Sequence, residues 1–298
     1  MIMFTGLSAF PLTPVDGDRV DEAAFIKLIE KLAAAKVASI GALGSTGNYM
    51  YLTRAERQRV AELAVAHAGA VPVIVCIGTQ RTRDVLALAE DAQKAGARGL
   101  LLPPVSYQKL TAEEVAGLFD TVTRNISVPL CVYDNPGTTH FNFDEQLYAR
   151  IAAMPNVASI KLPGISNDRG AELARIQRLR SLIPSHVTLG ISGDGYAANG
   201  LNAGCDAWYS VFGGLFPHTA LMIIEAAQMG DADTADAIST QLAPFWAFNQ
   251  RHGSLRVAAT AAEILGLVTA PCLPGPLLAL QGTERTELAA VMDRLQLA

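Results

Sequence analysis

Eight short apolar runs, each followed by a longer stretch with helical periodicity, dominate the sequence. The runs are rich in Val, Ile and Leu and cover residues 3–10, 37–43, 71–77, 98–103, 128–134, 157–162, 187–191 and 206–212. The stretches between them, such as DEAAFIKLIEKLAAA and TRDVLALAEDAQKAG, repeat apolar residues at the spacing of an amphipathic helix. Strands that are apolar on both faces and alternate with helices are typical of a parallel sheet covered by helices. Eight such units predict an α/β fold, a (β/α)8 barrel.

The domain organisation follows from the position of these units. Residues 1–230 would form the barrel, and residues 231–298 would form a C-terminal helical extension of the same domain, with three more helical patterns and the loop VTAPCLPGPL. A length of 298 residues is usual for one such barrel. A doubly wound open sheet is the main alternative, and two ordinary domains are also compatible with this length.

Composition narrows the class of protein. Half of the residues are hydrophobic, 17% are charged and the net charge is −5, so nucleic acid and anionic membrane are not expected as partners. The most apolar region, YSVFGGLFPHTALMIIEAA, is interrupted by Gly, Pro, His and Glu and is not expected to span a membrane. The four widely spaced cysteines predict reduced thiols in a cytoplasmic protein, and the N-terminal segment has no basic residue typical of a secretory signal.

The residues that could carry chemistry follow the apolar runs. The second run is followed by GSTG, the fourth by PPVSYQKL, the fifth ends in VYDNPGTTHF, the sixth ends in a lysine, and the seventh is followed by SGDGYA. In a (β/α)8 barrel the C-terminal ends of all strands meet at one face, which carries the active site. These segments are therefore expected to lie together.

Lys161 ends the sixth run, NVASIKLPG, on the same side of the strand as Val157 and Ser159. A lysine at a strand end ordinarily bends out to water, and this is one interpretation. In the other, the side chain lies in a dry pocket, where a lysine loses its proton more readily than in water. The free amine can then attack a ketone and form a Schiff base.

Two further segments are expected to lie near Lys161 and could take part in its chemistry. Tyr133 ends the fifth run and is either a core aromatic or a proton relay for carbinolamine formation and C–C cleavage. The GSTG segment is either a plain turn or an anion site. In the latter case Ser45, Thr46 and the start of the following helix would bind a carboxylate or a phosphate.

Other motifs are not expected to bind cofactors. The five histidines have no metal-ligand spacing, so no metal is predicted. No G-x-G-x-x-G or P-loop motif is present, so no nucleotide cofactor is predicted either. Asp194 in SGDG is interpreted as a turn or helix-cap residue.

Taken together, several segments resemble the dihydrodipicolinate synthase and N-acetylneuraminate lyase family. They are FTGLSAFPLTPVDGDRVD, GSTG, VYDNPGTT, IKLPG and LGISGDG, at the family's spacings over nearly the whole chain. The family consists of class I aldolase barrels that form a Schiff base. The resemblance implies a metal-independent carbon–carbon or carbon–oxygen lyase that needs no cofactor.

The resemblance also implies roles for single residues. Lys161 would form an imine with pyruvate or with the 2-oxo end of a longer acid, Tyr133 would relay protons with Ser45, and Tyr107 would complete the relay in a neighbouring subunit's site. Family members are commonly tetramers built as dimers of dimers, so we expect a tetramer or a dimer. The residues expected to bind substrate are Thr46, Gly47, Thr138, Thr139, Tyr209 and Gly193.

This sequence departs from the family pattern near the expected site. In the synthases the loop after the tyrosine reads Y-N-x-P-x-R-T, and its arginine binds the carboxylate of the aldehyde partner. Thr138 stands at the position of that arginine, and a hydroxyl cannot replace a bidentate guanidinium. Asn48 replaces a usual glutamate, Tyr209 replaces a small aliphatic residue, and Asp134 and Asn135 differ from the usual pair.

We therefore expect a class I lyase or aldolase that acts on pyruvate or a pyruvate-derived 2-oxo acid by aldol cleavage, condensation or dehydration. A hydroxylated or sugar-derived acid is favoured. The alternative within this class is a true 4-hydroxy-tetrahydrodipicolinate synthase, which condenses pyruvate with aspartate semialdehyde. A non-catalytic keto-acid-binding barrel is an alternative of another class, and a phosphate-binding barrel that uses GSTG and SGDG ranks last.

Overall fold

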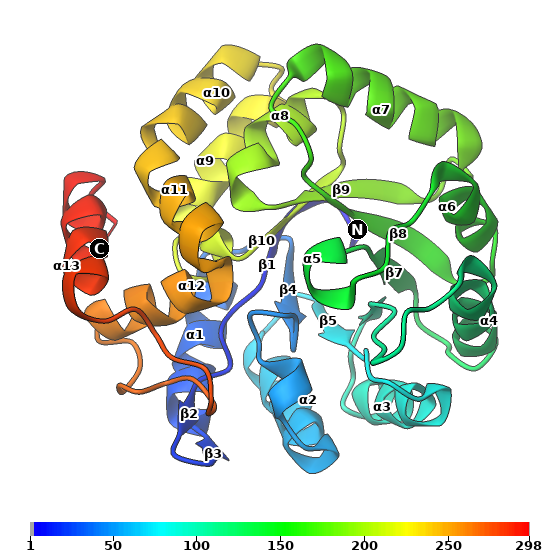
Figure 1. Ribbon diagram of the computed structural model, residues 1–298, viewed down its shortest axis with the longest axis horizontal. Coiled ribbons are helices and arrows are strands. Elements are labelled where there is room, and N and C mark those ends of the chain that lie inside the picture. The colour runs from blue at the N-terminus through cyan, green and yellow to red at the C-terminus, as the bar shows by residue number, and fades with distance from the viewer. Residues whose placement is uncertain (1–2, 298) are drawn as a thin grey trace.

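Eight parallel strands close into a barrel in the computed structural model, which describes residues 3–297 (Figure 1). The strands are β1 (Gly6–Ala9), β4 (Ser39–Ala42), β5 (Val73–Cys76), β6 (Gly99–Leu102), β7 (Leu130–Tyr133), β8 (Val157–Pro163), β9 (Thr188–Ser192) and β10 (Ala207–Ser210). Hydrogen bonds run around the ring from β1 through β10 and down to β4, which pairs with β1 again. Each predicted run overlaps one of these strands, and only β8 and β9 extend one residue beyond the predicted C-terminal bound. The predicted barrel is confirmed, and the doubly wound open sheet is wrong.

Helices follow the strands of the barrel, and most of them lie around its outside (Figure 1). They are α1 (Glu22–Ala34), α2 (Arg54–His67), α3 (Thr82–Lys94), α4 (Ala112–Thr123), α5 (Pro136–Thr139), α6 (Glu145–Ala152), α7 (Arg169–Leu182), α8 (Ala197–Asn202) and α9 (Pro217–Gln228). Thr53 and Thr111 begin α2 and α4 with capping boxes, in which the glutamate three residues later binds back to the threonine. A short hairpin of β2 (Val15–Asp16) and β3 (Arg19–Val20) precedes α1.

The strands are buried on both faces, which is why their sequences read as continuous apolar runs. Two glycines leave room for large rings inside the barrel. A Cβ on Gly41 would overlap the ring of Phe10, and one on Gly190 would overlap the ring of Tyr209. Both rings lie near the C-terminal ends of the strands, so the glycines shape the barrel where the site was predicted.

Four further helices follow α9: α10 (Ala232–Gln241), α11 (Ala243–His252), α12 (Ser254–Ile264) and α13 (Gly282–Arg294). Helix α11 packs against the turn η2 (Asp194–Tyr196), which directly follows β9. In this way the C-terminal segment reaches the end of the barrel that Figure 1 shows facing the viewer, where α5 also lies. The division into residues 1–230 and 231–298 stays a prediction.

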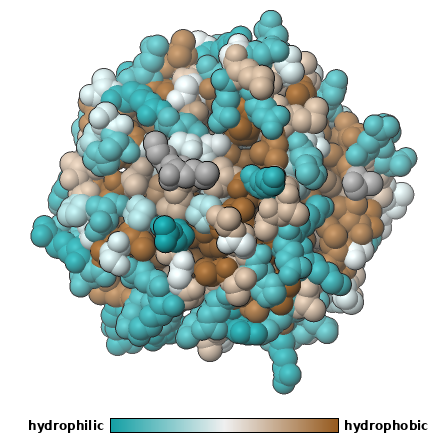
Figure 2. Space-filling view, turned by 180° about the vertical axis from the view of Figure 1, so that it is seen from behind, coloured by the Kyte–Doolittle hydropathy of each residue, from teal (hydrophilic) through white to brown (hydrophobic). Residues whose placement is uncertain are grey.

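The surface and the cysteines complete the description. Among residues 3–297, no helix combines the length and the apolar character needed to cross a membrane. The four cysteines are free thiols and all are buried. Figure 2 shows the face opposite to that of Figure 1, where hydrophobic side chains surface near the centre within a largely hydrophilic rim.

Candidate active site

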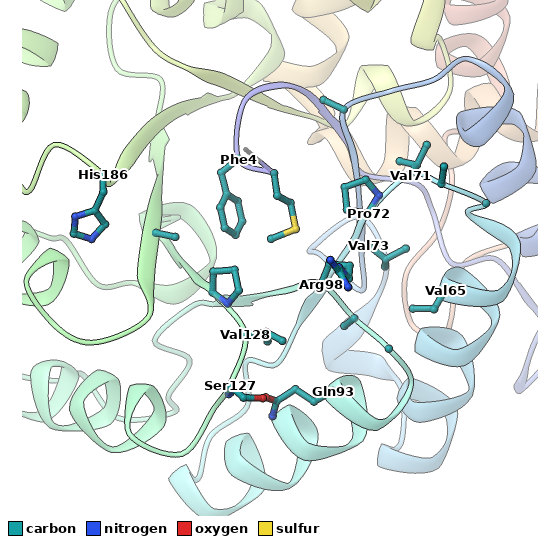
Figure 3. A pocket seen from close by; sticks show the side chains of 18 residues that line it. Phe4, Val65, Val71, Pro72, Val73, Gln93, Arg98, Ser127, Val128 and His186 are labelled. Atoms are coloured by element: carbon teal, nitrogen blue, oxygen red, sulfur yellow. The ribbon is translucent and has the colours of Figure 1, made fainter. Parts of the chain in front are cut away.

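A wide hollow lies at the N-terminal ends of the strands (Figure 3). It has a volume of about 1120 Å³ and is lined mainly by small and apolar side chains, with Phe4, Val71 and Val128 among them. Arg98 and His186, which also line it, are both exposed. None of the predicted site residues reaches this hollow. Its size therefore says nothing about catalysis, and the chemistry has to be sought at the other end of the barrel.

A second cavity, of about 290 Å³, opens at the C-terminal ends of the strands. The predicted site residues that line it are Tyr133, Lys161, Gly193 and Tyr209. The strand ends β7, β8 and β9 supply one side, and α11 and the start of α12 supply the other. Among the described residues that line this cavity, Lys161 is the sole cation.

Lys161 is buried inside the barrel, with 4% of its surface exposed. Its Nζ lies 4.1 Å from the ring centroids of both Phe10 and Tyr133 and 5.8 Å from that of Tyr209. Within residues 3–297 no carboxylate forms an ion pair with it. The interpretation of Lys161 as an outward-facing surface lysine is therefore wrong. The aromatic faces attract a cationic nitrogen and keep water away from it.

The Tyr133 hydroxyl has two partners in the chain. It lies 3.1 Å from Ser45 Oγ, and the side-chain amide of Asn135 donates to it at 2.8 Å. Tyr133 and Lys161 are register partners on β7 and β8, so the strands themselves hold the phenol beside the amine. The structure thus brings Lys161, Tyr133 and Ser45 together, as predicted from the sequence.

The GSTG loop after β4 is tightly folded. Thr46 is buried, and a Cβ on Gly47 would lie 2.9 Å from Leu43 Cα, so only glycine fits there. The expected helix dipole is absent from this loop. A 3-10 turn, η1 (Tyr49–Tyr51), intervenes, and α2 begins only at Arg54, because Thr53 supplies the cap. An anion at Ser45 would therefore be bound by hydroxyl and backbone groups and not by a helix terminus.

Tyr209 forms the floor beneath Lys161. It is 1% exposed, and its hydroxyl lies 2.6 Å from Ser159 Oγ, which is bonded in turn to Thr188 at 2.8 Å. The Cys131 thiol contacts the same hydroxyl at 3.5 Å. Burial raises the pKa of this thiol to about 11, so Cys131 remains a neutral thiol in the floor.

Asp194 is a buried carboxylate in the cavity wall. It accepts hydrogen bonds from Ser210 Oγ at 2.9 Å, from the Phe212 N–H at 3.0 Å and from Trp208 Nε1 at 3.2 Å. Burial raises the pKa of Asp194, while the hydrogen bond from Ser210 is the strongest opposing influence. The predicted turn or cap role is too narrow, because Asp194 links β9 to β10 directly behind the cavity.

The other predicted residues lie away from the cavity. Thr138 is exposed, and Thr139 is buried with its hydroxyl donating to the Asn135 carbonyl at 3.0 Å. Tyr107 is 87% exposed, and no hydrogen bond within residues 3–297 joins it to Tyr133 or Ser45. Roles for these three side chains in substrate binding or catalysis stay predictions.

Several lining residues were not anticipated from the sequence. They are Asn135, Tyr196, Trp246, Asn249, Gln250 and Ser254. Trp246 packs edge-on against Phe212 at 4.9 Å and thereby fixes α11 over the barrel end. Asn135 could have been found, since an amide two residues after Tyr133 in YDNP is an evident neighbour. The helices α11 and α12 carry no comparable motif.

Behind the loop, Asp134 and Tyr148 form a very short buried hydrogen bond between β7 and α6. Burial raises the pKa of Asp134 to about 6, although the bond from Tyr148 and the charge of Arg175 lower it. The Asp134 N–H donates to the Lys161 carbonyl at 3.1 Å. Asp134 thus ties the end of β7 to both β8 and α6.

The model of the dihydrodipicolinate synthetase family matches residues 3–295. The chain belongs to this family. Curated relatives include the 4-hydroxy-tetrahydrodipicolinate synthase of Acidiphilium cryptum, 30% identical with 99% of each chain covered. The corresponding enzyme of Nitrobacter hamburgensis is also 30% identical, with 91% of each chain covered.

Solved structures of the dihydrodipicolinate synthetase family have the same fold. A dihydrodipicolinate synthase from Agrobacterium tumefaciens is 43% identical, covers 98% of each chain and superposes with a TM-score of 0.94. A putative dihydrodipicolinate synthetase from Pseudomonas aeruginosa is 28% identical, with a TM-score of 0.90 over 98% of this chain and 99% of that one. As a family member the protein is a class I aldolase, a lyase of the Schiff-base type.

Proposed function

We propose that Lys161 forms an imine with the 2-oxo carbon of pyruvate or of a hydroxylated acid derived from it. The observation that carries the proposal is the position of the buried Lys161 nitrogen, 4.1 Å from the centroid of the Tyr133 ring. Within residues 3–297 no carboxylate forms an ion pair with this nitrogen. The Tyr133 hydroxyl is itself hydrogen-bonded to Ser45 and Asn135. A buried amine of this kind is the nucleophile of class I aldolases. The ring faces of Phe10 and Tyr133 stabilise the positively charged iminium that forms from the Lys161 amine.

The proposed reaction begins when the neutral Lys161 amine attacks the 2-oxo carbon. One proton passes from nitrogen to the carbonyl oxygen through Tyr133, which gives a neutral carbinolamine. The carbinolamine hydroxyl then takes the Tyr133 proton and leaves as water, so an iminium and a Tyr133 phenolate remain. In aldol cleavage the phenolate removes the proton of the C4 hydroxyl, the C3–C4 bond breaks, and its electrons form the enamine.

Ser45 and Thr46 are proposed to hold the carboxylate of the 2-oxo acid. They follow β4, and Ser45 is within hydrogen-bond distance of the Tyr133 hydroxyl, so the carboxylate and the reacting carbonyl would lie next to one another. Backbone N–H groups of the tightly folded Gly44–Gly47 segment would complete this anion site.

The far end of the substrate is proposed to be neutral and hydroxylated. The part of the lining that comes from α11 and α12 includes two amide residues and a hydroxyl residue, Asn249, Gln250 and Ser254. These groups donate to and accept from alcohols but supply no charge for a second carboxylate. This favours a sugar-derived 2-oxo acid over a dicarboxylic product.

A true 4-hydroxy-tetrahydrodipicolinate synthase is the second candidate, and the names of the curated relatives favour it. That reaction condenses pyruvate with aspartate semialdehyde, whose carboxylate needs a cation. Thr138 is neutral, and among the described residues that line the cavity only Lys161 is cationic. We therefore rank this candidate below the hydroxylated acid.

Borohydride trapping tests the proposal. The protein is incubated with pyruvate, reduced and measured by intact mass, with Lys161→Ala and Lys161→Arg as variants. One reduced pyruvyl group is expected on the wild type and none on either variant. Absence of an adduct on the wild type would instead indicate a non-catalytic keto-acid-binding barrel. A panel of 2-oxo acids assayed for pyruvate release, with aspartate semialdehyde and pyruvate as a separate arm, then ranks the two candidate functions.

Assembly and location are part of the proposal. The exposed ring of Tyr107 is typical of an interface residue and supports a homotetramer or homodimer. The four buried free thiols support a cytoplasmic location. Small-molecule acids are the expected partners.

A further inference from the structure

The Asn135 side chain reaches the oxygen through which Tyr133 would exchange protons. Its Nδ2 donates to Tyr133 Oη at 2.8 Å, and the same side chain lines the cavity. We infer that Asn135 is a positioning residue for the proton relay, whose amide orients the Tyr133 hydroxyl and stabilises the phenolate that forms from it. This inference rests on the proposed function of Lys161 and Tyr133, and it adds a residue that the family resemblance does not imply.

The contact fixes the direction of the relay. An amide N–H can only donate, so Tyr133 Oη accepts from Asn135. The one proton of Tyr133 is then free to point at Ser45 Oγ, 3.1 Å away, or at a bound substrate oxygen. The hydroxyl of Tyr133 is therefore oriented before the substrate arrives.

The Asn135 side chain bonds to Tyr133 and contributes no capping hydrogen bond to the helix that follows it. Asn135 precedes the short helix α5, a position where asparagine usually accepts a hydrogen bond from the helix. Its side chain makes no such bond. The turn is held instead by its carbonyl, which accepts from the N–H groups of Thr138 and Thr139, both at 3.0 Å. Changing the side chain therefore leaves the backbone bonds of the turn in place.

The chemistry explains what the amide contributes. When the carbinolamine hydroxyl takes the Tyr133 proton, water leaves and a phenolate remains beside the iminium. A hydrogen bond to an ionised oxygen is roughly twice as strong as one between neutral groups, so the Asn135 bond strengthens as the phenolate forms. An interaction that is stronger in the transition state accelerates the step and leaves ground-state binding nearly unchanged.

The test compares Asn135→Leu and Asn135→Asp with the control His140→Asn, which alters an exposed residue at the end of the same turn. The rate of imine formation with pyruvate is measured by quenching with borohydride at intervals, over a range of pyruvate concentrations. Loss of one such donor is expected to slow the step by roughly 10²-fold. Asn135→Asp should be slower than Asn135→Leu at neutral pH, because a carboxylate repels the phenolate. Half-saturation by pyruvate should change less than about threefold in both, since the contact acts mainly in the transition state.

The outcomes separate the inference from the proposed function. His140→Asn should retain the wild-type rate within about threefold, as expected for an exposed side chain outside the relay. If Asn135→Leu or a folded Asn135→Asp forms the imine at the wild-type rate, or if His140→Asn is as slow as they are, the inference is overturned. Absence of any adduct on the wild type overturns the proposed function itself. Circular dichroism of each variant establishes folding, and either Asn135 variant alone decides the result.

Discussion

Lys161 and Tyr133 are register partners on adjacent parallel strands, and the Lys161 nitrogen lies 4.1 Å from the centroid of the Tyr133 ring. The backbone pairing of β8 with β7 and with β9 fixes the positions of these two residues. At the strand ends the Asp134 N–H also donates a hydrogen bond to the Lys161 carbonyl. Groups placed by strands are positioned more precisely than groups on loops. The relation between amine and phenol is therefore fixed before any substrate binds.

Removing the Tyr133 hydroxyl should affect chemistry far more than folding. Tyr133→Phe retains the ring beside Lys161 but cannot relay protons, so enamine formation should fall roughly 10²- to 10⁴-fold. Folding stability should change by about 1 kcal/mol, the usual net value of a hydrogen bond. Deuterium incorporation at the methyl group of pyruvate, followed by NMR, measures enamine formation without a second substrate. An unchanged exchange rate would show that another group moves the proton.

Gly190 and Tyr209 should be strongly coupled. Gly190→Ala forces a methyl group into the Tyr209 ring and should cost about 1–3 kcal/mol of unfolding free energy. In a Tyr209→Val background the overlap with the ring is removed and only a contact of 3.1 Å with Ala207 Cβ remains, so the added cost should fall below about 1 kcal/mol. Urea denaturation of the two single variants, the double variant and the wild type measures this coupling. Additive effects would contradict the predicted overlap.

Asp134 should make stability depend on pH in an unusual direction. Its pKa is raised from 3.8 to about 6, so the folded protein binds the extra proton in this range. The stability that this proton supplies is complete below about pH 4 and is lost as pH rises to about 6, to a total of about 3 kcal/mol.

Asp134→Asn cannot titrate and should lack this loss. Urea midpoints at several pH values between 4 and 8 compare the two proteins, and all other carboxylates cancel in the difference. Parallel curves for the wild type and Asp134→Asn would show that Asp134 titrates as an ordinary carboxylate.

Position 138 should control the use of a charged aldehyde. Thr138→Arg introduces a guanidinium at an exposed position of the loop, where the family pattern has arginine. A bidentate bond to the carboxylate should raise kcat/KM for aspartate semialdehyde with pyruvate by about 10-fold or more. Thr138→Gln, equally long but neutral, serves as the matched control. A wild-type rate already equal to that of Thr138→Arg would favour the synthase candidate.

The barrel was predictable because its strands are buried on both faces. Each strand overlaps a predicted run, and the bounds differ by a few residues at most, as for residues 128–134 against Leu130–Tyr133. Lys161 was predictable because lysine is rarely buried, so a charge at the end of an apolar strand indicates a functional group. The helix dipole expected at GSTG was wrong, because η1 intervenes and the capping box of Thr53 begins α2 only at Arg54.

Side-chain direction could not be predicted in the same way. Asn135 and Thr139 are both polar and lie in one turn, yet the amide of Asn135 meets Tyr133 while the Thr139 hydroxyl meets the backbone. The wall from α11 and α12 depends on how distant segments pack. Trp246 packs against Phe212 and thereby fixes that wall. The local periodicity of the sequence does not predict this contact.

The residues that line the cavity come from two separate parts of the sequence. The amine, the phenol and Ser45 lie on or directly after barrel strands, whereas Asn249, Gln250 and Ser254 come from helices after the last strand. A single crossover between β10 and α11 could exchange the surface that meets the far end of a substrate and leave the bond-making groups as they are.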